Sequence, residues 1–212
     1  MTAPGSLEFV HRFVPSPSSG SPTLLLLHGT GGNETDLIPL GRQLARGAAL
    51  LSPRGRVLEN GMPRFFRRFA EGVFDLDDLK AQTAALARFI RASSEKYGFG
   101  GSEVIAVGYS NGANIATSLL LTEPDLLAGA VLFRAMAPFI PDSPPDLGNI
   151  PALLAAGRRD PIVSPEHTSK LAEILQAGGA RVSIHWHEGG HELGQDDLVA
   201  AKNWLSQRSK AA

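Results

Sequence analysis

Residues 104–115 read Val-Ile-Ala-Val-Gly-Tyr-Ser-Asn-Gly-Ala-Asn-Ile, a stretch whose pattern changes twice. The first four residues are apolar and mostly β-branched, which is typical of a strand buried on both faces. The next five form Gly-x-Ser-x-Gly around Ser110, and apolar residues at helical spacing follow. Between a strand and a helix, the two glycines permit a sharp turn that exposes the serine above the sheet. Ser110 is therefore a candidate nucleophile, and a helix N-cap is the alternative role.

Strand and helix patterns alternate along the rest of the chain. This alternation predicts an α/β protein in which a mostly parallel sheet is covered by helices on both faces. We expect a single domain over residues 1–212, with functional groups at the carboxyl ends of the strands. The predicted strands are 7–14 (an edge strand), 23–27, 48–52, 104–107, 128–133, 152–156 and 181–187, and the predicted helices are 33–45, 75–97, the helix after Ser110, 166–177 and 196–207.

Three segments between these elements are predicted to be irregular. Residues 15–22 are rich in proline and serine and are interpreted as a hairpin loop. Residues 56–74 are interpreted as a surface loop that is basic and aromatic. Residues 138–151 form a proline-rich loop and contain no inserted lid domain.

Composition narrows the classes of function. The 212 residues are 43% hydrophobic and 19% charged, an ordinary balance for a globular protein, and the formal net charge is −1. Nucleic acid is therefore not expected as a partner. The absence of cysteine excludes disulfides, a thiol nucleophile and a cysteine-ligated zinc. No signal peptide and no membrane-spanning run is visible, so a cytoplasmic protein without membrane insertion is expected.

A serine hydroxyl needs a base within hydrogen-bond reach, and the base needs a group that fixes its tautomer. In a strand–turn–helix site of this kind, the acid and then the histidine follow the serine along the chain. Asp160 comes directly after the predicted strand 152–156, although a surface aspartate in a turn is the alternative. His191 follows two glycines beyond the last strand. The competing aspartates do not follow strands: Asp125, Asp142 and Asp146.

The oxyanion of an acyl-transfer reaction must be met by backbone N–H groups. One should come from Asn111, the residue after the serine. The second is expected from the glycine-rich loop 28–32, where Thr30 is the best candidate, because glycines let a backbone approach a substrate closely. A phosphate-binding loop is disfavoured, since the chain has no Gly-x-x-x-x-Gly-Lys-Ser/Thr motif.

A metal site formed by His185, His187 and His191 is a further alternative, because the first two share one face of the last predicted strand. These histidines lack a carboxylate at a matching spacing. Histidines that pack or form hydrogen bonds are therefore favoured, and neither a metal nor a cofactor is expected.

Four motifs in this order resemble the phospholipase/carboxylesterase family of α/β-hydrolases, which includes acyl-protein thioesterases. The likeness covers nearly the whole chain and implies the α/β-hydrolase fold without a large lid domain. It also implies a triad of Ser110, Asp160 and His191, with oxyanion donors at Thr30 and Asn111. The motifs are His28-Gly29-Thr30-Gly31, Gly108-Tyr109-Ser110-Asn111-Gly112, Gly157-Arg158-Arg159-Asp160-Pro161 and Gly190-His191.

Within this family, residues 59–66 and 133–136 look more like the bacterial carboxylesterase branch linked to hydroquinone and quinone stress than like the thioesterases. The chain departs from the thioesterase pattern at Asn111, where glutamine is usual, and at Arg134.

Three further residues are candidates for substrate binding. Two of them are Arg64 and Arg134. Arg134 ends a strand and could bind a substrate carboxylate, although a structural salt bridge is an equal alternative. Phe65, with Phe66, would either line the pocket or cover the edge of the sheet.

The residues together predict a serine carboxylesterase that hydrolyses short-chain esters through an acyl-enzyme. The alternatives are an acyl-protein thioesterase or lysophospholipase, and a non-catalytic binding module on the same fold. The expected partner is a small-molecule ester, and a homodimer is left open.

Overall fold

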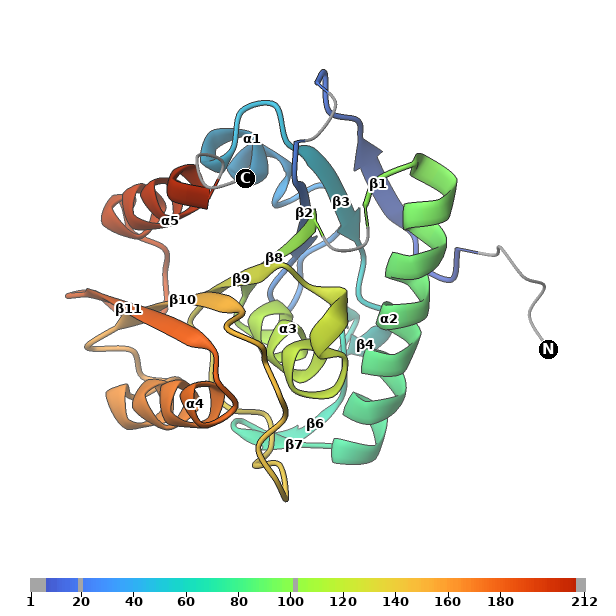
Figure 1. The fold of residues 1–212 in the computed structure, drawn as a ribbon. Helices are drawn as coiled ribbons and strands as arrows, with labels where there is room; N and C mark the ends of the chain where they lie inside the picture. The colour runs from blue at the N-terminus through green and yellow to red at the C-terminus, as the bar shows by residue number, and fades with distance from the viewer. Residues whose placement is uncertain (1–6, 19–20, 101–102, 209–212) are drawn as a thin grey trace.

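A seven-stranded sheet forms the centre of the computed structural model, which describes residues 7–18, 21–100 and 103–208 (Figure 1). Its strand order is β1-β3-β2-β8-β9-β10-β11. The edge strand β1 runs antiparallel to β3, and every other neighbouring pair is parallel, which confirms the predicted sheet. The strands are β1 (His11–Val14), β2 (Thr23–Leu27), β3 (Ala49–Pro53), β8 (Val104–Tyr109), β9 (Gly129–Phe133), β10 (Pro151–Gly157) and β11 (Arg181–His187).

Helices cover both faces of the sheet, as predicted (Figure 1). Because successive side chains of a strand point to opposite faces, β2 contributes to two separate cores. Leu24 and Leu26 belong to the core that includes residues of α1 and α5, whereas Leu25 and Leu27 belong to the core that includes residues of α2, α3 and α4. The helices are α1 (Ile38–Leu44), α2 (Leu76–Tyr97), α3 (Asn111–Thr122), α4 (Pro165–Ala177) and α5 (Gln195–Arg208), and the short 3₁₀ helix η2 (Pro124–Leu126) follows α3.

Two predictions for the N-terminal part of the chain are wrong. Residues 15–22 do not close a hairpin, because β3 lies between β1 and β2 in the sheet, and β1 pairs with β3. The helix predicted over 33–45 begins only at Ile38. Before Ile38, side-chain oxygens accept hydrogen bonds from backbone N–H groups. Asn33 Oδ1 accepts the N–H of Thr35, and Asp36 Oδ2 accepts the N–H of Asn33. Such local bonds compete with the helical pattern.

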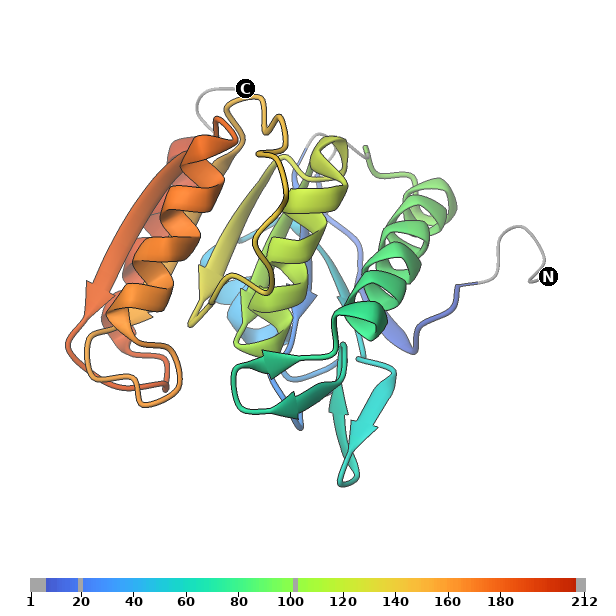
Figure 2. The ribbon, with the colours of Figure 1, turned by 90° about the horizontal axis from the view of Figure 1, so that it is seen from below.

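The surface loop predicted over 56–74 is also wrong, because the segment forms two short hairpins. They pair β4 (Val57–Glu59) with β5 (Met62–Arg64), and β6 (Arg68–Ala70) with β7 (Val73–Phe74). Asn60 and Gly61 both have positive φ, as the Asn-Gly turn of a two-residue hairpin requires. In Figure 2 both hairpins lie at the edge of the sheet where the arrowheads of β9 and β11 end.

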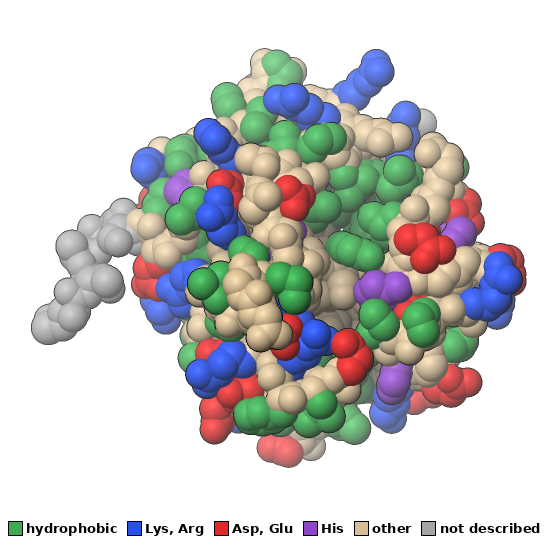
Figure 3. All heavy atoms as spheres, turned by 180° about the vertical axis from the view of Figure 1, so that it is seen from behind, with side chains coloured by type: hydrophobic (Ala, Val, Ile, Leu, Met, Phe, Trp, Pro, Cys, Tyr) green, Lys and Arg blue, Asp and Glu red, His purple; other side chains and the backbone are tan. Residues whose placement is uncertain are grey.

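The surface carries charges of both signs. On the face shown in Figure 3, Lys and Arg side chains are interspersed with Asp and Glu side chains. Among the described residues, none of the helices combines the length and the apolar character that a membrane crossing requires.

His28, the first residue after β2, ties the end of that strand to the segment that enters β4. Its ring is buried, with 2% of the residue exposed. The Nε2 atom accepts the N–H of Gly55 at 2.9 Å, and Nδ1 lies 2.7 Å from the carbonyl oxygen of Gly29. These contacts suit the neutral ring with its proton on Nδ1. Burial lowers the pKa of His28, which keeps the ring neutral.

The buried His28 predicts a loss of stability in acid. Because its folded-state pKa is depressed, the unfolded chain takes up the proton first as pH falls. The stabilisation is complete above the unfolded pKa of about 6.5 and decreases as pH falls from there towards the folded pKa. Urea unfolding at three pH values across this window measures the slope, and we expect a flatter slope for His28→Gln. His167→Gln, exposed on α4, is the control; equal slopes for wild type and His28→Gln would contradict the prediction.

Candidate active site

Ser110 lies in the sharp turn between β8 and α3, with φ 53° and ψ −116°. This backbone conformation is strained for a residue with a side chain. The flanking glycines are explained by close approaches of the backbone. A Cβ atom at Gly108 would lie 2.7 Å from the Cα atom of Ala113, and one at Gly112 would lie 2.0 Å from the carbonyl oxygen of Leu27. The turn therefore needs glycine at both positions and presents Ser110 at the carboxyl edge of the sheet.

Ser110, His191 and Asp160 form one chain of hydrogen bonds. His191 Nε2 lies 3.0 Å from Ser110 Oγ, and His191 Nδ1 lies 2.8 Å from Asp160 Oδ2. The three residues follow β8, β11 and β10, whose carboxyl ends meet at this edge because the strands are parallel. In such an arrangement the imidazole can accept the hydroxyl proton while the carboxylate holds its tautomer.

The Asp160 carboxylate is held from its other side as well. Oδ1 accepts the N–H groups of Ile162 at 2.8 Å and Val163 at 3.0 Å, which leaves Oδ2 for His191. The side chain is fully buried. The loop after β10 therefore fixes the carboxylate in one orientation.

Two backbone N–H groups beside Ser110 are available to a ligand. Within the described part of the chain, the N–H groups of Thr30 and Asn111 donate to no protein acceptor. Both residues are held through their side chains by the hairpin segment. Thr30 Oγ1 accepts from Arg64 Nη1 at 2.7 Å, and Asn111 Oδ1 accepts the N–H of Phe65 at 2.7 Å. Such N–H groups could stabilise an oxyanion formed at an ester carbonyl.

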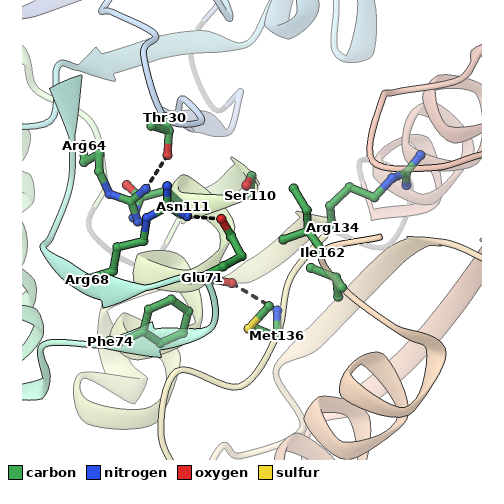
Figure 4. Close-up of a pocket in the computed structure, with 12 residues that line it drawn as sticks. Thr30, Arg64, Arg68, Glu71, Phe74, Ser110, Asn111, Arg134, Met136 and Ile162 are labelled. Atoms are coloured by element: carbon green, nitrogen blue, oxygen red, sulfur yellow. Dashed lines mark hydrogen bonds and ion pairs between the residues drawn. The ribbon is translucent and has the colours of Figure 1, made fainter. Parts of the chain in front are cut away.

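Arg64 and Arg68 belong to a charged network on one side of Ser110 (Figure 4). Arg64 is buried and forms an ion pair with Glu59 at 3.2 Å, and Arg68 pairs with both Glu59 and Glu71. Burial lowers the pKa of Arg64, and the positive charge of Arg68 acts in the same direction. The hydrogen bond from Arg68 holds the pKa of Glu59 below its usual range. Arginine stays protonated at neutral pH even when its pKa is lowered, so two positive charges lie beside Ser110.

A small cavity of about 20 Å³ lies beside Ser110, which is room for little more than one water molecule. Of the three residues considered for substrate binding, Arg64 and Arg134 line this cavity, whereas Phe65 does not. The Phe65 ring is buried against His28, with 4.8 Å between the ring centroids. The lining of the cavity beside Ser110 also includes Thr30, Arg68, Phe74, Asn111, Met136 and Ile162.

The charged guanidinium of Arg134 does not face this cavity. It points away from Ser110 (Figure 4) and forms a buried ion pair with Asp197 at 2.6 Å. This geometry favours the structural salt bridge over the binding of a substrate carboxylate.

The three histidines of the metal alternative do not gather in the described residues. His191 belongs to the hydrogen-bond chain of Ser110, whereas His185 lies with Asp196 and Asp197. His187 Nδ1 lies 2.9 Å from Asp196 Oδ2. His185 Nε2 lies 3.7 Å from an oxygen of each of the two carboxylates and has no hydrogen-bond partner among the described residues.

The sequence analysis did not identify several residues of the site. Asn114 Oδ1 accepts the N–H of Met136 at 3.0 Å and shapes the floor of the cavity. Arg68 and Glu71 lie in the β6–β7 hairpin, in a segment interpreted as a loop. The Asn60-Gly61 pair was an available signal for the other hairpin, β4–β5, alone. No local signal distinguishes the buried Asp197 from its exposed neighbour, Asp196.

Comparison with known proteins identifies the family of the chain. The phospholipase/carboxylesterase family matches residues 11–209. The putative hydrolase MhqD of Bacillus subtilis (strain 168) is 48% identical over 184 residues, which are 87% of this chain and 92% of that protein. The crystal structure of the Bacillus cereus carboxylesterase superposes with a TM-score of 0.93 at 44% identity and covers 94% of both chains. The structure of YahD with malic acid superposes with a TM-score of 0.89 at 30% identity, covering 94% of this chain and 98% of that one. The chain belongs to the phospholipase/carboxylesterase family of α/β-hydrolases.

Proposed function

We propose that this hydrolase is a serine carboxylesterase that cleaves short-chain carboxylic esters through an acyl-enzyme. The observation that carries the proposal is the unbroken hydrogen-bond chain from Ser110 through His191 to Asp160. The strained backbone of Ser110 supports the same role, since strain of this kind is typical of a nucleophile at such a turn.

In the first half of the reaction, Ser110 Oγ attacks the ester carbonyl carbon while His191 Nε2 accepts the hydroxyl proton. The carbonyl oxygen becomes an oxyanion that accepts the N–H groups of Thr30 and Asn111. Asp160 stabilises the imidazolium. The intermediate then collapses as His191 returns the proton to the leaving alkoxide, which departs as the alcohol.

In the second half, a water molecule attacks the acyl-enzyme, with His191 accepting its proton. The second oxyanion collapses by breaking the bond to Ser110 Oγ, and His191 returns the proton to the serine. The products are a carboxylic acid and the free enzyme.

The surroundings of Ser110 support a short and polar substrate. The cavity is small, and Arg64 and Arg68 line it, so that a polar or acidic part of the ester could meet a guanidinium there. The related protein YahD has been solved with malic acid, a small polar acid. A palmitoyl chain would need a long apolar channel instead. For this reason we favour an ester over a lipidated protein as the substrate.

Replacing the nucleophile tests the proposal directly. We expect Ser110→Ala to lower kcat for p-nitrophenyl acetate by about 10⁴-fold or more, because no other group takes over covalent catalysis. A fluorophosphonate probe should label the wild type and leave Ser110→Ala unlabelled. Ser164→Ala, at the N-cap of α4, is the matched control and should keep both properties. Equal turnover by Ser110→Ala and wild type would disprove the mechanism.

The length of the acyl group provides a second test. We expect kcat/KM for p-nitrophenyl esters to fall by at least about tenfold between the butyrate and the octanoate, because the small cavity beside Ser110 would leave more of the longer chain outside it. Palmitoyl-coenzyme A, assayed in parallel, should be a poorer substrate than the acetate ester. Preferential turnover of the palmitoyl thioester would instead identify a thioesterase.

A further inference from the structure

His191 lies on a segment with no regular structure of its own. Residues 188–194 connect β11 to α5 without forming a helix or strand, and Gly189 and Gly190 precede the histidine. Glycines leave a loop with many accessible backbone conformations. The position of the imidazole between Ser110 and Asp160 must therefore come from contacts with other parts of the fold.

Arg134 supplies two of these contacts. Its Nε donates to the carbonyl oxygen of Gly190 at 3.1 Å, and its Nη2 donates to the carbonyl oxygen of Glu192 at 2.6 Å. These two residues immediately flank His191 in the sequence. A single planar guanidinium thus holds the backbone on both sides of the histidine, which the rigid fork of an arginine can do and a lysine cannot.

The guanidinium is itself fixed from the opposite side. Its Nη1 and Nη2 donate to the two carboxylate oxygens of Asp197 at 3.1 and 2.6 Å, and Nη1 also donates to the carbonyl oxygen of Ala155 at 3.0 Å. The five N–H groups of Arg134 therefore all have acceptors. Asp197 also accepts the N–H of Gly194 at 2.8 Å, at the far end of the same loop.

Tyr109, the residue before the nucleophile, supplies the third contact. Its hydroxyl donates to the carbonyl oxygen of His191 at 3.1 Å, and the two rings lie 5.5 Å apart. Burial raises the pKa of Tyr109, so the hydroxyl remains a donor. Three consecutive carbonyl oxygens, of residues 190, 191 and 192, each accept a hydrogen bond from Arg134 or Tyr109.

We propose that Arg134 and Tyr109 are positioning residues that act through the backbone of residues 190–192 to hold the His191 imidazole between Ser110 and Asp160, with Asp197 as the anchor of Arg134. The role rests on the proposed serine-esterase function. A displacement of about 1 Å in a catalytic group can cost about 10²-fold in rate, so a loosened loop should lower kcat far more than substrate binding. A purely structural ion pair would instead affect stability alone.

Tyr109→Phe tests the proposal with the smallest change. It removes one hydroxyl and leaves the ring, so the fold should be retained. We expect kcat for p-nitrophenyl acetate to fall by about tenfold with KM within about twofold. The low-field proton resonance of the bond between His191 Nδ1 and Asp160 should broaden. Tyr97→Phe, which removes the other tyrosine hydroxyl of the chain, bonded to His11, is the matched control and should change neither.

The double variant Arg134→Met/Asp197→Leu tests the larger contact without leaving a buried charge unpaired, since apolar residues of similar size often replace a buried ion pair without loss of stability. We expect kcat to fall by about 10²-fold with KM nearly unchanged. Arg91→Met/Glu123→Leu, which removes an ion pair between α2 and the end of α3, should keep wild-type kinetics.

Two results would overturn the proposal: a folded double variant with wild-type kcat, or Tyr109→Phe with wild-type kcat and an unchanged proton resonance. If the double variant does not fold, Tyr109→Phe decides alone. A failure of the esterase function is distinguishable, because the wild type itself would then neither turn over the ester nor react with a fluorophosphonate, whereas the proton resonance would still report whether Tyr109 holds His191.

Discussion

The close approach of Gly112 to the end of β2 is the contact on which the rest of the site depends. A side chain at Gly112 would collide with the carbonyl oxygen of Leu27, so any other residue would push α3 away from the sheet. With glycine there, Ser110 and the first turn of α3 lie beside the loop that begins at His28. In the proposed mechanism, this proximity lets N–H groups from two different elements, at Thr30 and Asn111, bind one carbonyl oxygen.

Segments outside the central sheet hold the groups that the sheet brings together. The hairpins of residues 57–74 act on the nucleophile side, where Arg64 holds Thr30 and the backbone of Phe65 holds Asn111. Arg134 acts on the histidine side through the backbone around His191. The strands thus bring the site residues to one edge of the sheet, and these supporting contacts fix how the site residues are oriented there. Orientation is the more demanding requirement, because proton transfer depends on distances near 3 Å.

The candidate nucleophile, acid and base could all be predicted from the sequence because each lies shortly after the end of a strand. Parallel strands end at one edge, so Ser110, Asp160 and His191 were expected to meet there. Arg134 also follows a strand, but the same rule did not reveal its role. The ion-pair partner of Arg134, Asp197, lies 63 residues further along the chain. The other acceptors of Arg134 are backbone carbonyl oxygens, which a pattern of side chains does not predict. The hairpins were missed because strands of two or three residues are too short for an alternation to show.

By itself, the sequence determined the alternation of strands and helices, the parallel sheet and the order of the motifs, because hydrophobic periodicity and glycine geometry act over a few neighbouring residues. Only the tertiary structure decided that β1 pairs with β3, that the ring of Phe65 faces away from the cavity, and that Arg134 turns towards Asp197. Those outcomes depend on which distant surfaces pack together. The packing selects among orientations that are equivalent at the level of local sequence.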